Sequence, residues 1–146
     1  MGTATGGKSI DIANWGHPLV LFFYPKDFTP GCTVESKDFS TRYEDFKKLG
    51  VDVIGVSPDT LSSHEKFRDK EGLREDLISD PDKVLCEAFG VIKEKNLYGR
   101  KYMGVERSTF VLDKNGVVVQ EWRGVKVPGH VDEVYQFVKE NREQLL

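Results

Sequence analysis

Residues 19–35 read LVLFFYPKDFTPGCTVE, and this stretch decides how the chain around it is expected to fold. Residues 19–24 are almost entirely apolar, which is typical of a strand buried on both faces of a sheet. A loop punctuated by proline and glycine follows, and Cys32 stands where a helix is expected to begin. Unpaired backbone N–H groups and the positive end of a helix dipole favour a thiolate at such a position. The stretch therefore predicts a reactive cysteine between a buried strand and a helix.

The composition is that of one ordinary globular domain. The chain has 146 residues, of which 38% are hydrophobic and 31% charged, and its net charge is −3. This length favours a single domain over residues 1–146. The negative charge offers no basic surface for nucleic acid, and no apolar run reaches the roughly 20 residues that span a membrane. Residues 1–7 lack the apolar core of a signal peptide, and two distant cysteines make no disulfide framework, so we expect a cytoplasmic protein.

The hydrophobic pattern alternates strands and helices along the chain. It predicts further strands over residues 51–56, 77–78, 108–112 and 117–122, the last two joined by a hairpin turn at 113–116. It predicts helices over residues 33–49, 62–70 (capped by Ser62 or Ser63), 82–89 and 131–144. Residues 10–15 are interpreted as a short strand or a turn, and residues 90–104 as a loop. The order implies an α/β fold with a central mixed β-sheet flanked by helices on both faces.

Several motifs resemble those of a known family. The run PKDFTPGC at residues 25–32 resembles the peroxidatic-cysteine motif of peroxiredoxins, and TPGCTVE at 29–35 resembles the bacterioferritin-comigratory, or BCP/PrxQ, subfamily. The likeness continues through VIGVSPD at 53–59, SDP at 79–81 and RSTFVLDKNG at 107–116, so it covers nearly the whole chain. It implies a thioredoxin-like fold and an antioxidant enzyme that reduces hydrogen peroxide and organic hydroperoxides with thiols.

The resemblance also implies which residues form the site. Cys32 would attack the peroxide and become a sulfenic acid. Thr29 would offer its hydroxyl to the peroxide, and Arg107 would place a cationic fork beside the thiolate. The backbone N–H groups of Gly31 and Cys32 would complete the donors, and Pro25 would shield the pocket from water.

Other polar and aromatic residues receive structural interpretations. Glu35 matches the subfamily motif, but a carboxylate near Cys32 would oppose thiolate formation, so we assign it no catalytic role. The three histidines show no metal-ligand spacing, and His130 is interpreted as a residue at a helix start. Trp122 and Tyr24 are interpreted as core or pocket wall.

The chain departs from the family pattern at two places. Many relatives carry a resolving cysteine five residues after the first, where this chain has Lys37, and others carry it near residues 67–70, which hold none. The second thiol, Cys86, is interpreted as a buried core residue. We therefore expect the sulfenic acid to be reduced by thioredoxin, glutaredoxin or a small thiol. The subfamily resemblance and the absence of an obvious interface stripe favour a monomer, and we expect no metal or cofactor. The alternatives are a peroxide sensor and a two-cysteine peroxidase that resolves through Cys86. The second departure is an N-terminal hairpin that is short or missing.

Overall fold

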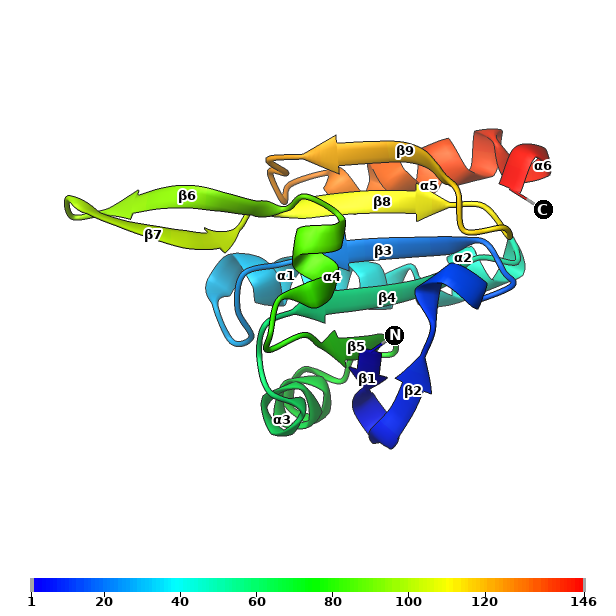
Figure 1. The fold of residues 1–146 in the computed structure, drawn as a ribbon. Coiled ribbons are helices and arrows are strands. Elements are labelled where there is room, and N and C mark those ends of the chain that lie inside the picture. The colour runs from blue at the N-terminus through cyan, green and yellow to red at the C-terminus, as the bar shows by residue number, and fades with distance from the viewer. Residues whose placement is uncertain (1, 146) are drawn as a thin grey trace.

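A seven-stranded mixed sheet forms the centre of the protein in a computed structural model that describes residues 2–145 (Figure 1). The strand order is β2-β1-β5-β4-β3-β8-β9, with β3 parallel to β4, β4 parallel to β5, and the other neighbours antiparallel. The seven strands are β1 (Gly2–Ala4), β2 (Lys8–Ile10), β3 (Leu19–Phe23), β4 (Asp52–Ser57), β5 (Asp76–Ser79), β8 (Ser108–Leu112) and β9 (Val118–Arg123). The mixed α/β architecture agrees with the sequence prediction.

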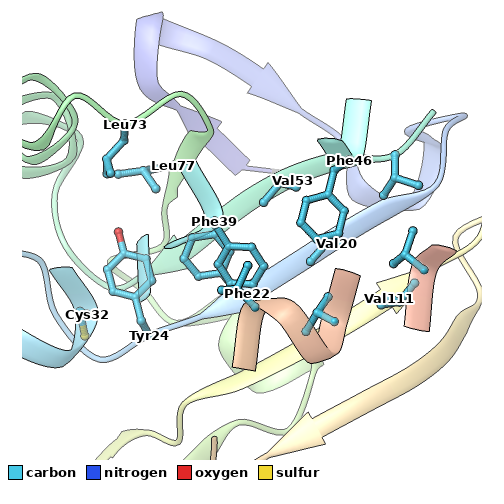
Figure 2. Packing of buried hydrophobic residues seen from close by; sticks show 14 of the residues in the cluster. Val20, Phe22, Tyr24, Cys32, Phe39, Phe46, Val53, Leu73, Leu77 and Val111 are labelled. Carbon is cyan, nitrogen blue, oxygen red and sulfur yellow. The ribbon is translucent and has the colours of Figure 1, made fainter. Parts of the chain in front are cut away.

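The central strand β3 is buried along its whole length, as its apolar sequence predicts. Its side chains alternate between two hydrophobic clusters, because successive residues of a strand point to opposite faces of the sheet. Val20 and Phe22 belong to one cluster, in which the rings of Phe22 and Phe39 stack 4.4 Å apart (Figure 2). Leu21 and Phe23 belong to the cluster on the other face.

Helices cover both faces of the sheet, but unequally. Figure 1 shows α1, α2 and α5 behind the sheet and α4 in front of it. The helices are α1 (Pro30–Thr41), α2 (Tyr43–Lys48), α3 (Leu61–Glu71), α4 (Val84–Ala88), α5 (His130–Glu140) and α6 (Arg142–Leu145), with 3-10 turns η1 (Thr5–Gly7) and η2 (Ile12–Asn14). None of those described between residues 2 and 145 has the length and apolarity needed to cross a bilayer.

The predicted helix boundaries need correction. The helix expected over residues 33–49 is two helices, because Arg42 has non-helical backbone angles, and α1 begins at Pro30, ahead of Cys32. Proline fits a first helical turn, where its missing N–H is not needed. The cap of α3 is Thr60, whose hydroxyl accepts from the Ser63 N–H at 3.2 Å, rather than Ser62 or Ser63. The last predicted helix is also divided, at Asn141.

The prediction of a loop over residues 90–104 was wrong. These residues form an antiparallel hairpin of β6 (Ile92–Leu97) and β7 (Arg100–Val105), which extends beyond the sheet (Figure 1). Tyr98 and Gly99 turn the chain with positive φ values of 52° and 81°, as a tight hairpin requires. The hairpin is largely exposed, so its sequence lacks the apolar alternation by which strands are recognised.

The N-terminal hairpin is present and short. Strands β1 and β2 have three residues each, and β1 also pairs with β5 through Thr3 opposite Ser79 and Ala4 opposite Ile78. Of the two interpretations of residues 10–15, the turn is correct beyond Ile10, since η2 occupies Ile12–Asn14. The terminal residues Met1 and Leu146 of the predicted domain lie outside the described part.

Glu75, just before β5, is a fully buried carboxyl group. Neither of its carboxyl oxygens has a hydrogen-bond partner within residues 2–145, and burial raises its pKa to about 8. In the unfolded chain its pKa is near 4.5, so between pH 4.5 and 8 the folded state binds the additional proton. The free energy of unfolding therefore falls as the pH rises through this window, by about 1.4 kcal/mol per pH unit from this group.

We expect Glu75→Gln to remove this contribution. The free energy of unfolding is measured by urea titration at several pH values from 5 to 8. Its decrease with rising pH should be smaller in the variant than in the wild-type protein, by up to about 1.4 kcal/mol per pH unit. The exposed Glu143 offers a matched control, because Glu143→Gln should leave the slope unchanged. Parallel slopes for wild type and Glu75→Gln would contradict the assignment of a protonated carboxyl.

Candidate active site

Cys32 lies in the first turn of α1, immediately behind the loop that leaves β3. Thr29 is the N-terminal cap residue of the helix, and its carbonyl oxygen accepts from the Thr33 N–H at 2.9 Å. Cys32 is 1% exposed and belongs to the cluster that contains Tyr24, at one end of the row of rings in Figure 2. The free N–H groups of a first turn favour negative charge there, as the sequence predicted.

Arg107 reaches this sulfur from another part of the chain. It precedes β8, whose Ser108 pairs with Phe23 at the end of β3, so the antiparallel register brings Arg107 to the same edge of the sheet as the cysteine loop. Its Nη2 donates to Cys32 Sγ at 3.3 Å. Gly31 leaves room for this approach, because a Cβ atom there would lie 3.2 Å from Nη2. The predicted proximity of Arg107 to Cys32 is therefore present in the structure.

Glu35 binds the second terminal nitrogen of the same guanidinium, a contact that the sequence did not predict. Arg107 Nη1 donates to Glu35 Oε1 at 2.8 Å, and the carboxyl group is fully buried. Burial raises the pKa of Glu35 to about 7, against the opposing effect of the Arg107 charge. The carboxyl is thus partly protonated near neutral pH, which weakens the objection to an acid near Cys32. The spacing of three residues from Cys32 places both on one helix face, and that signal could have found it.

Thr29 and Pro25 occupy the loop before the sulfur. The Thr29 hydroxyl donates to the Lys26 carbonyl oxygen at 2.9 Å, and both Thr29 and Pro25 are half-buried. The Thr29 oxygen keeps acceptor capacity while it donates to the backbone. The structure therefore places these residues on the loop that leads to Cys32, whereas the side chain that hydrogen-bonds to the sulfur within residues 2–145 is that of Arg107.

Two further basic residues lie within the electrostatic influence of Arg107. Burial and the Arg107 charge both lower the pKa of Lys95, a residue of the unexpected hairpin. The same causes lower the pKa of His130 to about 4, so its ring is neutral at pH 7. His130 begins α5, as predicted, and its Nε2 lies 2.8 Å from Thr109 Oγ1. The Trp122 ring contacts His130 edge to face and serves as a wall of this region.

Cys86 lies on the opposite face of the sheet from Cys32. It belongs to the hydrophobic cluster of Leu21 and Phe23, whereas Cys32 belongs to that of Phe22. The Cys86 residue is fully buried, and burial raises the pKa of its thiol far above the usual range. The interpretation of Cys86 as a core residue agrees with these surroundings, and the two sulfurs are separated by the central sheet.

Comparisons with known proteins place this geometry in a family. Residues 3–121 match the AhpC/TSA family. The chain is 52% identical to peroxiredoxin Bcp of Xanthomonas campestris pv. campestris, with 96% of this chain and 88% of that protein covered. It is 46% identical to peroxiredoxin Bcp of Bacillus subtilis, with 94% and 88% covered.

Solved structures give the same result. A structure of Xanthomonas campestris peroxiredoxin Q superposes with a TM-score of 0.91 at 48% identity, covering 97% of this chain and 90% of that one. That protein has also been solved as serine mutants of the cysteines numbered 48 and 84 in its own chain, 36 positions apart. The thioredoxin-like fold expected from the sequence is confirmed. The chain therefore belongs to the AhpC/TSA family, as a thiol-dependent peroxiredoxin of the Bcp/PrxQ type.

Proposed function

We propose that Cys32 is the nucleophile that reduces hydrogen peroxide and organic hydroperoxides, in antioxidant defence. The single observation that carries this assignment is the contact between Arg107 Nη2 and Cys32 Sγ, 3.3 Å long, at the first turn of α1. A guanidinium and free backbone N–H groups around one sulfur favour its thiolate and leave further donors for an anionic leaving group. The related Xanthomonas protein has been studied for alkyl peroxide reduction, which supports organic hydroperoxides as substrates.

The proposed step is an in-line displacement on oxygen. The Cys32 thiolate attacks one peroxide oxygen, a new S–O bond forms, and the O–O bond breaks. The electron pair of that bond leaves with the second oxygen, which takes up a proton and departs as water or an alcohol. Sulfur is oxidised by two electrons and the peroxide is reduced by two. Most of the acceleration comes from donors that orient the peroxide and stabilise the developing oxyanion.

The other site residues have distinct proposed roles. The Thr29 hydroxyl and the Gly31 and Cys32 N–H groups orient the peroxide, and Pro25 limits the access of water. The near-complete burial of Cys32 supports this, since polar interactions are stronger where water is excluded.

An external thiol is proposed to return Cys32 to its reduced form. The remaining thiol, Cys86, lies across the sheet. The sulfenic acid would condense with a thiol to a mixed disulfide and water, and a second thiol would release Cys32. Thioredoxin, glutaredoxin or a small thiol serves this role in a cytoplasmic, monomeric enzyme.

Intact-mass spectrometry after one equivalent of peroxide tests both parts of this proposal. We expect a mass gain of about one oxygen, located at Cys32 by peptide mapping, because no second thiol is within reach. A loss of about two hydrogens would mean a disulfide with Cys86 and would overturn the one-cysteine mechanism. Adding thioredoxin, its reductase and NADPH should then give many turnovers per chain, whereas a peroxide sensor would stop after one.

A further inference from the structure

A cluster of buried polar groups lies directly beside the loop that carries Pro25 and Thr29. Its centre is Asp27 of that loop, 3% exposed, and His64 of α3, which is fully buried. Asp27 Oδ2 is 2.7 Å from His64 Nδ1, while Asp27 Oδ1 accepts from the Tyr24 hydroxyl at 2.7 Å. The sequence reasoning gave neither Asp27 nor His64 a role.

Both nitrogens of the His64 ring have a hydrogen-bond partner. Nδ1 lies 2.7 Å from Asp27 Oδ2, and Nε2 lies 2.9 Å from the carbonyl oxygen of Ile78 in β5. The ring therefore bridges the cysteine loop and β5, with Asp27 on one nitrogen and the Ile78 carbonyl oxygen on the other. Asp27 and His64 form a buried hydrogen-bonded pair.

The same cluster has the composition of a metal site, but both nitrogens of its histidine already have hydrogen-bond partners. Ligand atoms of Asp27, Asp59 and His64 all lie within 4.8 Å of one another. Asp59 Oδ2 accepts from the Asp27 N–H at 2.8 Å and from the Ser57 hydroxyl at 2.5 Å. A metal ion on His64 would have to displace the hydrogen bond to Asp27 or the one to Ile78. We therefore interpret the cluster as a hydrogen-bonded network.

The network joins the cysteine loop to two other elements. Through Asp27 the loop is bound to His64 and Ser63 of α3, whose hydroxyl donates to Oδ2 at 2.8 Å, and through His64 it is bound to β5. Asp27 is two residues from Pro25 and two from Thr29, so a fixed Asp27 leaves little freedom to either. Tyr24, whose hydroxyl donates to Asp27, belongs to the same core cluster as Cys32 (Figure 2).

We propose that Asp27 and His64 are positioning residues for peroxide reduction: their buried pair fastens the loop to α3 and β5, so that Pro25, Thr29 and the first turn of α1 keep their places around Cys32. The inference rests on the proposed role of Cys32. Reaction rates depend steeply on such placement. A mutation far from the reacting atoms that misplaces a catalytic group by about 1 Å can lower the rate roughly a hundredfold. The titratable groups that face the pair are Tyr24 and Asp59, and no lysine or arginine of residues 2–145 donates to it.

The kinetic test uses Asp27→Asn, His64→Gln and the double variant, with the second-order rate of Cys32 oxidation by hydrogen peroxide as readout. We expect each single variant to be at least roughly tenfold slower than wild type, and the double variant no slower than the slower single one, since both act through one pair. Val53→Ala, in the core of β4, is the control for lost stability alone, and its rate should stay within about twofold of wild type. Single variants as fast as Val53→Ala would overturn the proposal.

A second measurement needs no variant. In ¹H–¹⁵N NMR of the wild-type protein, a proton on a His64 ring nitrogen should give a slowly exchanging downfield signal, because both nitrogens are buried and hydrogen-bonded. The absence of such a signal, or one tightly bound metal ion per chain, would overturn the assigned pair. An inactive wild-type protein would instead refute the role of Cys32, while the NMR result would stand unaffected, so the two failures are distinguishable.

Discussion

We expect Cys32→Ser to consume peroxide no faster than buffer, and Cys86→Ser to keep the first oxidation step intact. The serine hydroxyl is not ionised at neutral pH and is a far weaker nucleophile toward oxygen than a thiolate, so this exchange removes the reacting atom while nearly preserving its volume. The measurement is peroxide loss in the presence of thioredoxin, thioredoxin reductase and NADPH. Full activity in Cys32→Ser would refute the assignment of the active site.

Cys86→Ser is the matched control, since it makes the same chemical change at the other cysteine. Cys86 is buried on the other face of the sheet from Cys32, so the variant is expected to lose some stability but to form the sulfenic acid at the wild-type rate. Loss of turnover with an intact first step would instead assign a resolving function to Cys86. The two variants thus test separately whether Cys32 is the nucleophile and whether Cys86 takes part in returning it to the thiol.

The second large effect is expected from Arg107→Ala. Arg107 Nη2 contacts the sulfur, and the loss of one donor that stabilises a developing oxyanion typically slows a reaction by about a hundredfold or more. We expect the rate of peroxide reduction to fall at least roughly tenfold, even at a pH where Cys32 is fully ionised. A pH series of stopped-flow measurements gives this comparison. A loss of rate that high pH fully restores would show that only ionisation of the thiol had changed.

Two arginine variants sharpen the result. Arg107→Lys keeps the positive charge but loses the planar guanidinium, whose two terminal nitrogens contact Cys32 and Glu35 separately, so its rate should lie between those of wild type and Arg107→Ala. Arg100→Ala removes an exposed charge from β7 and should leave the rate nearly unchanged. If Arg107→Lys matched wild type, a point charge would suffice and the two-armed geometry would have no role.

The regular elements next to the core were predictable from the sequence. The apolar run of β3 and the periodicity of the terminal helices depend on burial, which leaves a direct pattern in the residues. The β6–β7 hairpin was missed because most of its side chains face water, where strand pairing selects no apolar alternation. The break at Arg42 was missed for the opposite reason, since apolar positions continue at helical spacing on both sides of it.

The sequence by itself determined the helix-start setting of Cys32 and the family. These follow from neighbouring residues, because a strand, a Pro/Gly loop and a first helical turn are local structures. The tertiary structure decided which distant groups face that sulfur. The register of β8 on β3 places Arg107 beside Cys32. The buried Glu35 carboxyl group accepts a hydrogen bond from Arg107, and His64 of α3 contacts Asp27. These contacts join residues 37 to 75 positions apart, and such separations are set by packing, which no local pattern encodes.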